Sequence, residues 1–305
     1  MVYLTGDTHG DFHKIVDFVE RIGVTGVTKD DLIVILGDAG FNFFGDVRDV
    51  VSKELVNSLG VPVFCIHGNH EMRPRHISTY HLVSFAGAMA YQEPEYKNLY
   101  FGLDGAVYNL QGTRCLVMGG AYSVDKYARL YRYLSFVVSN GQDQPFCTVD
   151  EAFHLAPKVA SFIKTNPSKP GKKDYFDAIC NHLQDEIHWW SDEQPSGHDL
   201  SAAAQLLSSA NANSSVDCIL SHTCPADYVP IEALLGGINQ ALVDDSTEQA
   251  LQELKNIKPN IPWYCGHWHI DKKRDNVRFL MDDFLSLDGK HYRSDFGHSA
   301  CHNQV

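Results

Sequence analysis

Five strand ends constrain the fold of this 305-residue chain more than any other feature of its sequence. Each of the five strands is predicted from a short apolar run. A glycine or a serine, and then polar residues, follow each run. Such runs predict buried strands, and open α/β sheets place their sites at the carboxyl edge of the strands. The runs are 2–5, 32–36, 63–66, 216–220 and 261–265, and the polar residues after them are Asp7 and His9, Asp38, Asn69 and His70, His222, and His267 and His269.

Helical periodicity separates the first three runs. Apolar residues recur at helical spacing over 12–22 and over 47–59, and Asp46 is a favourable N-cap for the second segment. This alternation of strand and helix predicts parallel strands joined by right-handed crossovers. From residue 99 the pattern changes to short strands separated by the turns Asp104-Gly105 and Gln111-Gly112, which favours antiparallel or mixed sheet.

Residues 135–189 fit the alternation poorly. They carry Asn140-Gly141 and the Pro- and Lys-containing stretch 166–173 between scattered helical segments. We interpret 135–189 as an inserted cap or lid. The remainder, 1–134 and 190–305, is then one α/β core, which is large enough to bury a sizeable interior.

The charge balance is acidic, with 38 acidic and 25 basic side chains and a formal net charge of −13. The overall field therefore repels nucleic acids and anionic membranes, although a locally basic pocket charged by metal ions is compatible with it. No apolar run reaches the roughly 20 residues that span a bilayer, and no signal peptide is expected because a strand begins at Val2. The eight cysteines form no CxxC pair. We therefore expect a cytoplasmic protein with reduced thiols.

The polar residues at the strand ends have metal-ligand chemistry. Side chains two residues apart past a strand end, as in Asp7 and His9 or His267 and His269, can point into one cavity. Their carboxylate and imidazole donors, with amide oxygens, are typical of sites for manganese, iron, zinc or nickel. Asp38 suits a carboxylate that bridges two ions. Two metals about 3.5 to 4 Å apart clamp both oxygens of an in-line phosphoryl displacement, and a bridging water becomes a hydroxide nucleophile near neutral pH.

The five blocks resemble, in order, the signature of the calcineurin-like metallophosphoesterase superfamily. They are Asp7-Thr8-His9, Gly37-Asp38, Gly68-Asn69-His70-Glu71, His222 and Gly266-His267-Trp268-His269, and they span almost the whole chain. The resemblance implies a four-layer α/β/β/α sandwich with its site at one edge. It also implies two divalent metal ions, with manganese preferred over iron, zinc or nickel, and hydrolysis of phosphoric ester bonds.

The resemblance assigns a role to each site residue. The binuclear centre would consist of Asp7, His9 and His269 at one ion, Asn69, His222 and His267 at the other, and Asp38 between them. His70 would not bind metal but would stabilise the transition state or protonate the leaving oxygen. Glu71 resembles the acidic residue that orients this histidine, a role consistent with carboxylate control of the tautomer.

This chain differs from the Ser/Thr protein phosphatases of the superfamily and therefore resembles another subgroup. Those enzymes carry phosphate-binding arginines where this chain has residues 41–43 and His67. The segments 119–126 and 191–196 instead resemble a poorly characterised bacterial or phage group, in which the two segments lie closer together. That difference supports 135–189 as an insertion.

Other basic residues could bind the substrate phosphate. Arg73 and Arg75 follow the histidine block and either contact phosphate, cap the next helix or pair with acidic neighbours. Lys126 and Arg129 follow a predicted strand end and either contact phosphate or lie on a solvated helix face.

These observations favour a two-metal hydrolase of phosphate monoesters or diesters with a nucleotide or another small phosphoester as substrate. A protein phosphatase is disfavoured by the missing arginines, and a nuclease by the acidic charge. A non-catalytic metal-binding scaffold is the alternative from another class, but a degenerate scaffold would be expected to lose some of Asp7, Asp38 or His70. The oligomeric state is open.

Overall fold

The computed structural model describes residues 1–23, 30–138, 172–209, 215–234 and 243–293. The chain divides into two compact units. The core unit comprises 1–122 and 192–302, and the second unit comprises 123–191 with 303–305. Residues 139–171, most of the predicted cap, lie outside the described residues.

The larger sheet of the core unit has eight strands in the order β14-β13-β1-β2-β3-β6-β5-β4. They are β1 (Val2–Thr5), β2 (Leu32–Ile35), β3 (Val63–Cys65), β4 (His81–Phe85), β5 (Ala88–Gln92), β6 (Leu99–Gly102), β13 (Phe284–Ser286) and β14 (His291–Tyr292). The neighbours β1, β2, β3 and β6 are parallel, and the other pairs are antiparallel. Thr5 lies opposite Ile35 and Ile35 opposite Cys65, so the first three strands end level with one another.

The smaller sheet has six strands in the order β11-β12-β10-β9-β8-β7. They are β7 (Val107–Leu110), β8 (Thr113–Met118), β9 (Cys218–Ser221), β10 (Trp263–Cys265), β11 (Lys272–Arg274) and β12 (Val277–Phe279). Parallel pairing joins β8, β9, β10 and β12, while β7 and β11 are antiparallel at the two edges. The mixed sheet predicted after residue 99 is therefore confirmed.

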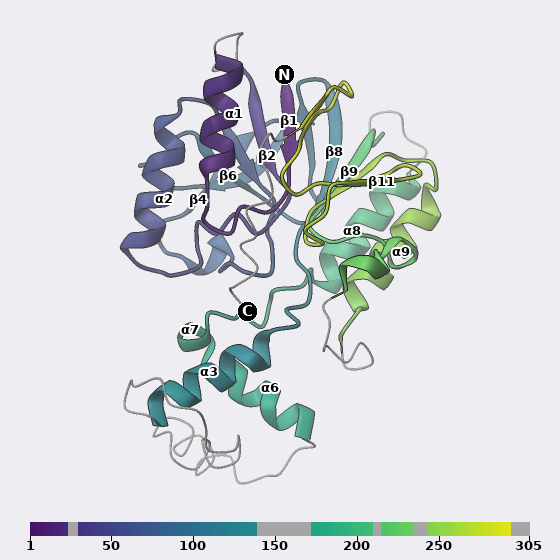
Figure 1. Ribbon diagram of the computed structural model, residues 1–305. Coiled ribbons are helices and arrows are strands. Elements are labelled where there is room, and N and C mark those ends of the chain that lie inside the picture. The colour runs from purple at the N-terminus through teal and green to yellow at the C-terminus, as the bar shows by residue number, and fades with distance from the viewer. Residues whose placement is uncertain (24–29, 139–171, 210–214, 235–242, 294–305) are drawn as a thin grey trace. The chain divides into compact units, whose positions relative to one another are not determined.

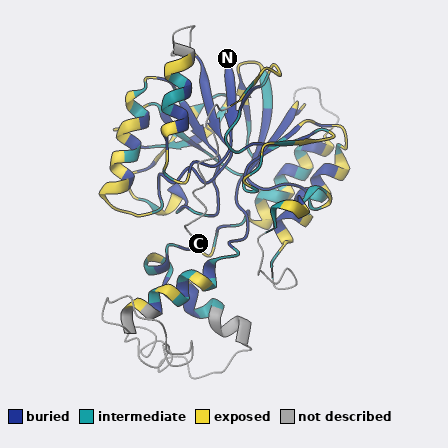
Figure 2. Cartoon of the chain, in the orientation of Figure 1, coloured by how far each residue is buried: buried dark blue, intermediate teal, exposed yellow. Residues whose placement is uncertain are grey.

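Helices cover the outer face of each sheet, so that the core unit has four layers (Figure 1). Helices α1 (His13–Gly23) and α2 (Val47–Ser58) pack on the larger sheet, and α8 (Gly197–Ser208) and α9 (Ser246–Ile257) pack on the smaller one. Alternate residues of one strand enter different layers: Val34 lies in the core between the sheets, whereas Ile33 lies beneath α1 and α2. Figure 2 shows this arrangement as buried strands between helices with exposed outer faces. The predicted α/β/β/α sandwich is confirmed.

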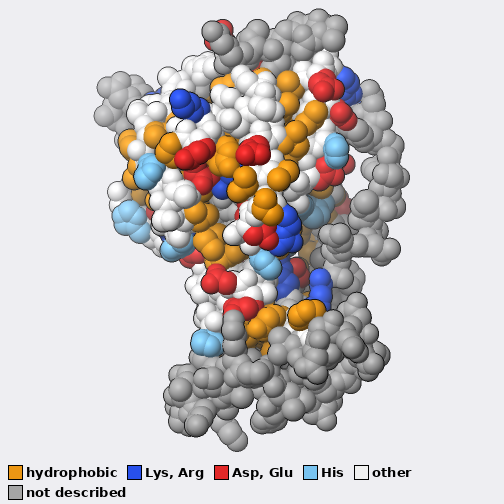
Figure 3. Space-filling model, turned by 90° about the vertical axis from the view of Figure 1, so that its left-hand side faces the viewer, with side chains coloured by type: hydrophobic (Ala, Val, Ile, Leu, Met, Phe, Trp, Pro, Cys, Tyr) orange, Lys and Arg blue, Asp and Glu red, His pale blue; other side chains and the backbone are white. Residues whose placement is uncertain are grey.

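Helix α2 begins as the sequence predicts, since the Asp46 side chain accepts a hydrogen bond from the Arg48 N–H at 2.8 Å. Its apolar stripe, however, faces outward, with Val47 69% and Val51 58% exposed. Figure 3 views the molecule from the side on which α2 lies in Figure 1, and hydrophobic side chains, in orange, are visible at that surface. The buried side of α2 instead carries Lys53, whose Nζ lies 2.6 Å from the Glu93 carboxylate.

The described part of the second unit is helical, with α3 (Lys126–Val138), α6 (Lys172–His182) and α7 (Gln184–Ile187). Ion pairs connect Lys126 to Asp177 at 2.8 Å and Arg129 to Asp125 at 2.8 Å. The short 3₁₀ helices of the core unit are η1 (Pro74–His76), η3 (Ala226–Tyr228) and η4 (Ile231–Ala233). None of the helices described here is both long and apolar enough to cross a membrane.

Candidate metal centre

Five loops meet where β1, β2, β3, β9 and β10 end. Backbone hydrogen bonds hold the loops to one another: the His9 N–H donates to the Asp38 carbonyl at 2.8 Å, and the Gly266 N–H donates to the His222 carbonyl at 2.9 Å. The two sheets are joined at the same place, because the His222 ring nitrogen Nδ1 lies 2.9 Å from the Leu36 carbonyl oxygen. The convergence predicted from the five apolar runs is therefore present in the fold.

The glycines that precede the polar residues allow this close approach. A Cβ atom on Gly37 would lie 2.0 Å from Nδ1 of His222, and one on Gly68 would lie 1.9 Å from Oδ1 of Asp38. A Cβ on Gly266 would lie 2.2 Å from Oδ1 of Asp7. No side chain larger than hydrogen fits at these positions, so each glycine is required by the loop that it faces.

Strained backbone is concentrated at the same loops. His9 and Asp38 both have φ of 47°, His267 has φ of 64° and His269 has φ of 50°. Residues other than glycine rarely adopt this left-handed conformation, and those that do cluster at functional sites. Four of the seven predicted metal ligands therefore carry backbone strain that the surrounding structure must compensate.

One group of side chains centres on Asp7. His269 Nε2 lies 3.4 Å and His9 Nε2 lies 3.7 Å from Asp7 Oδ2, and the two imidazole nitrogens are 3.0 Å apart. Asp7 Oδ1 accepts a hydrogen bond from the His267 N–H at 2.9 Å, whereas Oδ2 is buried and has no hydrogen-bond donor among the described residues. A buried carboxylate oxygen without a donor, facing two imidazoles, fits a bound cation.

A second group centres on Asp38 and His222. His222 Nε2 lies 2.9 Å from Asn69 Oδ1 and 3.5 Å from Asp38 Oδ1. The His267 ring packs against the His222 ring with centroids 4.9 Å apart. Asp38 Oδ2 faces the first group, 3.9 Å from His9 Nδ1. Asp38 thus faces both groups, with Oδ1 toward His222 and Oδ2 toward His9.

The protonation states of Asp7, Asp38 and His267 suit cation binding. Burial alone would raise the pKa of Asp7, but the nearby imidazoles of His269 and His222 outweigh it and lower the value to about 2. Burial also opposes ionisation of Asp38, yet the neighbouring histidines, His222 first, hold its pKa well below the usual range. Burial and the charge of His222 lower the pKa of His267 to about 3, so its ring is neutral.

Two histidines are exceptions. Asp7 raises the pKa of the His269 ring, and the other exception is His222. Burial would lower its pKa, but the Asp38 carboxylate outweighs that effect and raises the pKa to about 9. A cation that binds His222 must displace a proton, as is usual when histidines become metal ligands.

His70 lies beside this centre with its side chain partly exposed. Its ring is 5.3 Å from the His9 ring between centroids, and its backbone N–H donates to Asp38 Oδ1 at 2.8 Å. The Glu71 carboxylate accepts hydrogen bonds from the Gly68 N–H at 3.1 Å and the Gly40 N–H at 3.3 Å. Glu71 therefore ties the loops after β2 and β3 together, and its role in orienting the His70 ring stays a prediction. Burial, with the charge of Asp38, raises the pKa of Glu71 to about 7.

The two arginines after the histidine block are held by acidic partners. Arg73 is buried, its Nη1 lies 2.6 Å from Asp104 Oδ2, and its Nε donates to the Asp192 carbonyl at 2.7 Å. Arg75 is exposed and pairs with the Asp192 carboxylate. Of the alternatives considered for these arginines, pairing with acidic neighbours is the one that matches the contacts.

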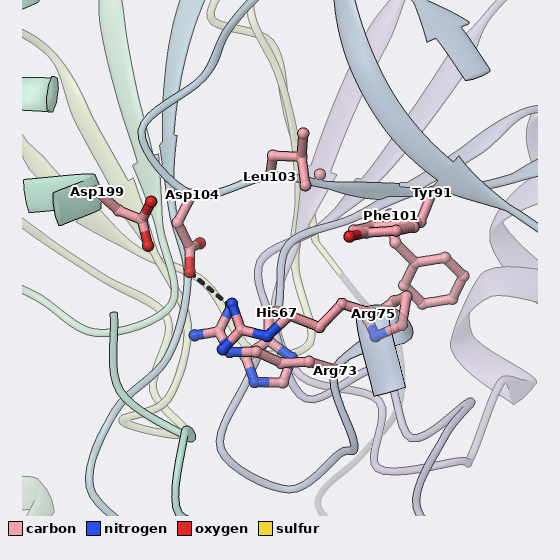
Figure 4. Close-up of a pocket in the computed structure, with 10 residues that line it drawn as sticks. His67, Arg73, Arg75, Tyr91, Phe101, Leu103, Asp104 and Asp199 are labelled. Carbon is pink, nitrogen blue, oxygen red and sulfur yellow. Dashed lines mark hydrogen bonds and ion pairs between the residues drawn. The ribbon is translucent and has the colours of Figure 1, made fainter. Parts of the chain in front are cut away.

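Both arginines nevertheless line a cavity of about 190 Å³ (Figure 4). His67 also lines it, and both of its buried ring nitrogens have no hydrogen-bond partner among the described residues. Burial and the charge of Arg73 hold the pKa of His67 well below its usual range, so the ring is neutral. The aromatic rings of Tyr91 and Phe101 contribute apolar walls. Sequence reasoning did not predict this cavity.

The predicted phosphate contacts of Lys126 and Arg129 stay predictions. Both residues belong to the second unit, where Lys126 pairs with Asp177 and the Arg129 Nη1 donates to the His188 carbonyl at 2.6 Å.

Two supporting groups were not predicted from the sequence. The buried Lys14 ammonium donates to the carbonyls of Gly6 at 3.1 Å and Asp7 at 2.7 Å, and burial lowers its pKa to about 8. On the other side of the centre, the Thr223 hydroxyl donates to the buried Glu248 carboxylate at 2.7 Å and accepts from the Trp268 indole N–H at 3.2 Å. The only sign of the Lys14 contacts in the sequence was the presence of a lysine among the apolar residues of α1.

Comparison with known proteins agrees with this geometry. The family model described as calcineurin-like phosphoesterase matches residues 1–271, which include all seven predicted metal ligands. No curated protein matches the chain. The match extends over most of the sequence and ends just after the last of the five loops. The chain therefore belongs to the calcineurin-like phosphoesterase family and is a metal-dependent hydrolase of phosphoric ester bonds.

Proposed function

We propose that the five-loop centre binds two divalent cations and hydrolyses the monoester or diester bond of a nucleotide or another small phosphoester. Asp7, His9 and His269 would hold one cation, and Asn69, His222 and His267 the other. Asp38 would contact both. The observation that carries the proposal is the position of Asp38, whose two carboxylate oxygens face different groups of ligands.

The donor set supports this assignment. It combines carboxylates that are ionised, imidazoles and one amide oxygen, which suits manganese first and iron, zinc or nickel as alternatives. Cations held here would activate a water molecule and withdraw charge from the phosphoryl oxygens.

The protein's own contribution to the reaction is positioning and proton transfer. Asp38 fixes the backbone of His70 through a hydrogen bond of 2.8 Å, which places the His70 ring beside the ligand cluster without making it part of the Asp7 group. A partly exposed imidazole in this place can deliver a proton to the leaving oxygen. Glu71 supports this arrangement indirectly, because it connects the loop of Asp38 to the loop of Asn69.

The charges favour a small substrate. The net charge of −13 opposes long nucleic acids, and Arg73 and Arg75 are already paired with Asp104 and Asp192. The arginines by which protein phosphatases of the family bind phosphoproteins are absent, since residues 41–43 and His67 occupy those positions. We also propose a cytoplasmic location, in keeping with the buried free thiols of the described cysteines.

Hydrolysis of two chromogenic esters tests the proposal. Purified protein would be stripped with a chelator, reloaded with Mn²⁺, and assayed with p-nitrophenyl phosphate and bis-p-nitrophenyl phosphate. We expect turnover that depends on added metal and that Asp7→Asn abolishes. Preference for the diester would support a nucleotide-type substrate, and preference for the monoester would return phosphoproteins to consideration. Metal binding without turnover of either ester would instead leave a gated, substrate-specific site or a non-catalytic scaffold.

A further inference from the structure

An aromatic ring lies next to the proposed proton donor. The Phe43 ring is nearly parallel to the His70 ring, with an angle of 18° between planes and 6.4 Å between centroids. His70 in turn contacts His9, one of the predicted ligands. Phe43 is neither fully buried nor fully exposed. The loop after β2 therefore presents an apolar, flat side chain beside the His70 ring.

The loop that carries Phe43 is fixed on its N-terminal side. Phe41 is fully buried and stacks on Phe12, with ring centroids 4.4 Å apart. Asn42 is held twice: its carbonyl accepts from the Met72 N–H at 2.9 Å, and its side-chain oxygen accepts from the Tyr80 hydroxyl at 2.9 Å. The bond from Met72 ties the Phe43 loop directly to the loop of His70.

The loop is also fixed on its C-terminal side. The buried Asp49 carboxylate accepts hydrogen bonds from the Phe44 N–H at 3.1 Å and the Gly45 N–H at 2.7 Å. With anchors on both sides, the position of Phe43 relative to His70 is set before any substrate binds. A surface that is ordered in advance loses less conformational entropy on binding.

Resting on the proposed function, we propose that Phe43 is a specificity residue that stacks on an aromatic ring of the substrate, so that the enzyme prefers phosphoesters bearing a nucleobase or an aryl group. An aromatic ring stacks on a phenyl side chain through offset or edge contacts that a sugar or an alkyl group makes only weakly. The family's protein phosphatases have an arginine in this loop, which binds the phosphate group of the substrate. In this chain the loop offers a ring instead.

Matched substrates isolate the effect of the ring. Adenosine 5′-monophosphate and ribose 5-phosphate carry the same ester and the same leaving oxygen and differ in the base. Thymidine 5′-(methyl phosphate) and 2-deoxyribose 5-(methyl phosphate) form the corresponding diester pair, in which the base is the only aromatic ring. The kcat/KM ratio within a pair, measured on the Mn²⁺-loaded full chain, reports the contribution of the ring independently of how well the metal centre works.

Phe43→Leu removes the aromatic face and keeps an apolar side chain. We expect it to lower the ratio within a pair by about 10-fold, which lies in the range found for stacking of one base on one aromatic side chain. Phe43→Trp should retain the preference. Phe44→Leu is the matched control, since Phe44 lies edge-on to Phe43 at 4.9 Å between centroids and is covered by the Arg48 guanidinium 3.6 Å from its own ring centroid.

The outcomes separate this inference from the proposed function. Loss of the preference in Phe43→Leu, but not in Phe44→Leu or Phe43→Trp, supports the inference. A nucleotide pair that responds while p-nitrophenyl phosphate does not would identify a base, and the reverse would identify an aryl ester. Equal effects of Phe43→Leu on both members of a pair would overturn the inference and leave the hydrolase intact. No turnover of any ester would overturn the proposed function itself.

Discussion

Asp38 Oδ1 accepts a hydrogen bond from the backbone N–H of His70 at 2.8 Å. The carboxylate that would join the two cations therefore also positions the residue that would protonate the leaving group. The two roles can be separated by substitution, because the bond from His70 involves its backbone and not its imidazole.

Asp38→Asn should lower the occupancy of both cations. The amide keeps an acceptor for the His70 N–H but loses the negative charge that two neighbouring cations need. Metal content of the purified variant, measured by elemental analysis against the wild type, checks this expectation. An unchanged metal content would refute the bridging role.

His70→Ala should retain the metals and lose most of the activity. A general acid contributes roughly 10²- to 10⁴-fold to rate, so kcat should fall by about that factor while metal content stays at the wild-type level. Loss of metal in this variant would mean that His70 is a ligand, which its distance to the His9 and Asp38 donor atoms also permits.

Gly68→Ala should disrupt the metal centre by displacing Asp38. The added methyl group would lie 1.9 Å from Asp38 Oδ1 and 2.1 Å from the Asp38 backbone nitrogen, so Asp38 must move. Overpacking of this kind costs about 1–3 kcal/mol or more, and metal binding should weaken. Urea unfolding gives the stability.

Gly197→Ala is the control for Gly68→Ala, because its added methyl group would meet nothing within 4 Å. We expect its stability within about 0.5 kcal/mol of wild type. Equal stability of the two variants would show that the close approach at Gly68 is not a constraint.

Thr223→Val should weaken the support behind His222. The substitution keeps the shape of the side chain but removes the hydroxyl that joins Glu248 to the Trp268 indole. Leaving the buried carboxylate without this donor should cost about 1–3 kcal/mol. Thr223→Ser, which restores the hydroxyl, should recover most of that loss in urea unfolding. If valine and serine at this position give the same stability, the hydroxyl carries no net stabilisation.

The ligand cluster could be predicted from the sequence because strand ends and glycines are local signals. Each polar residue follows an apolar run, and the parallel register then brings the ends of β1, β2 and β3 level without further information. The four layers were implied by the resemblance to the family, whereas the alternation predicted only the parallel strands and their crossovers. The short strands β4, β5, β13 and β14 carry weaker patterns and were not predicted.

The side-chain partners could not be predicted because they are distant in sequence. The buried side of helix α2 carries Lys53, which pairs with Glu93, 40 residues away in the sequence. Arg73 donates hydrogen bonds to the Asp104 carboxylate and to the Asp192 carbonyl, 31 and 119 residues away. Glu71 similarly accepts a hydrogen bond from the amide of Gly40, 31 residues away. These choices depend on which loops the fold places together.

The number of metal ions per chain tests the central claim most directly. The full chain would be purified without added chelator, loaded with Mn²⁺, passed through a desalting column and measured by elemental analysis, with Asp7→Asn in parallel. The two groups of ligands joined by Asp38 predict close to two ions per wild-type chain and fewer in the variant. A wild-type chain that retains no metal under any loading condition would contradict the binuclear centre.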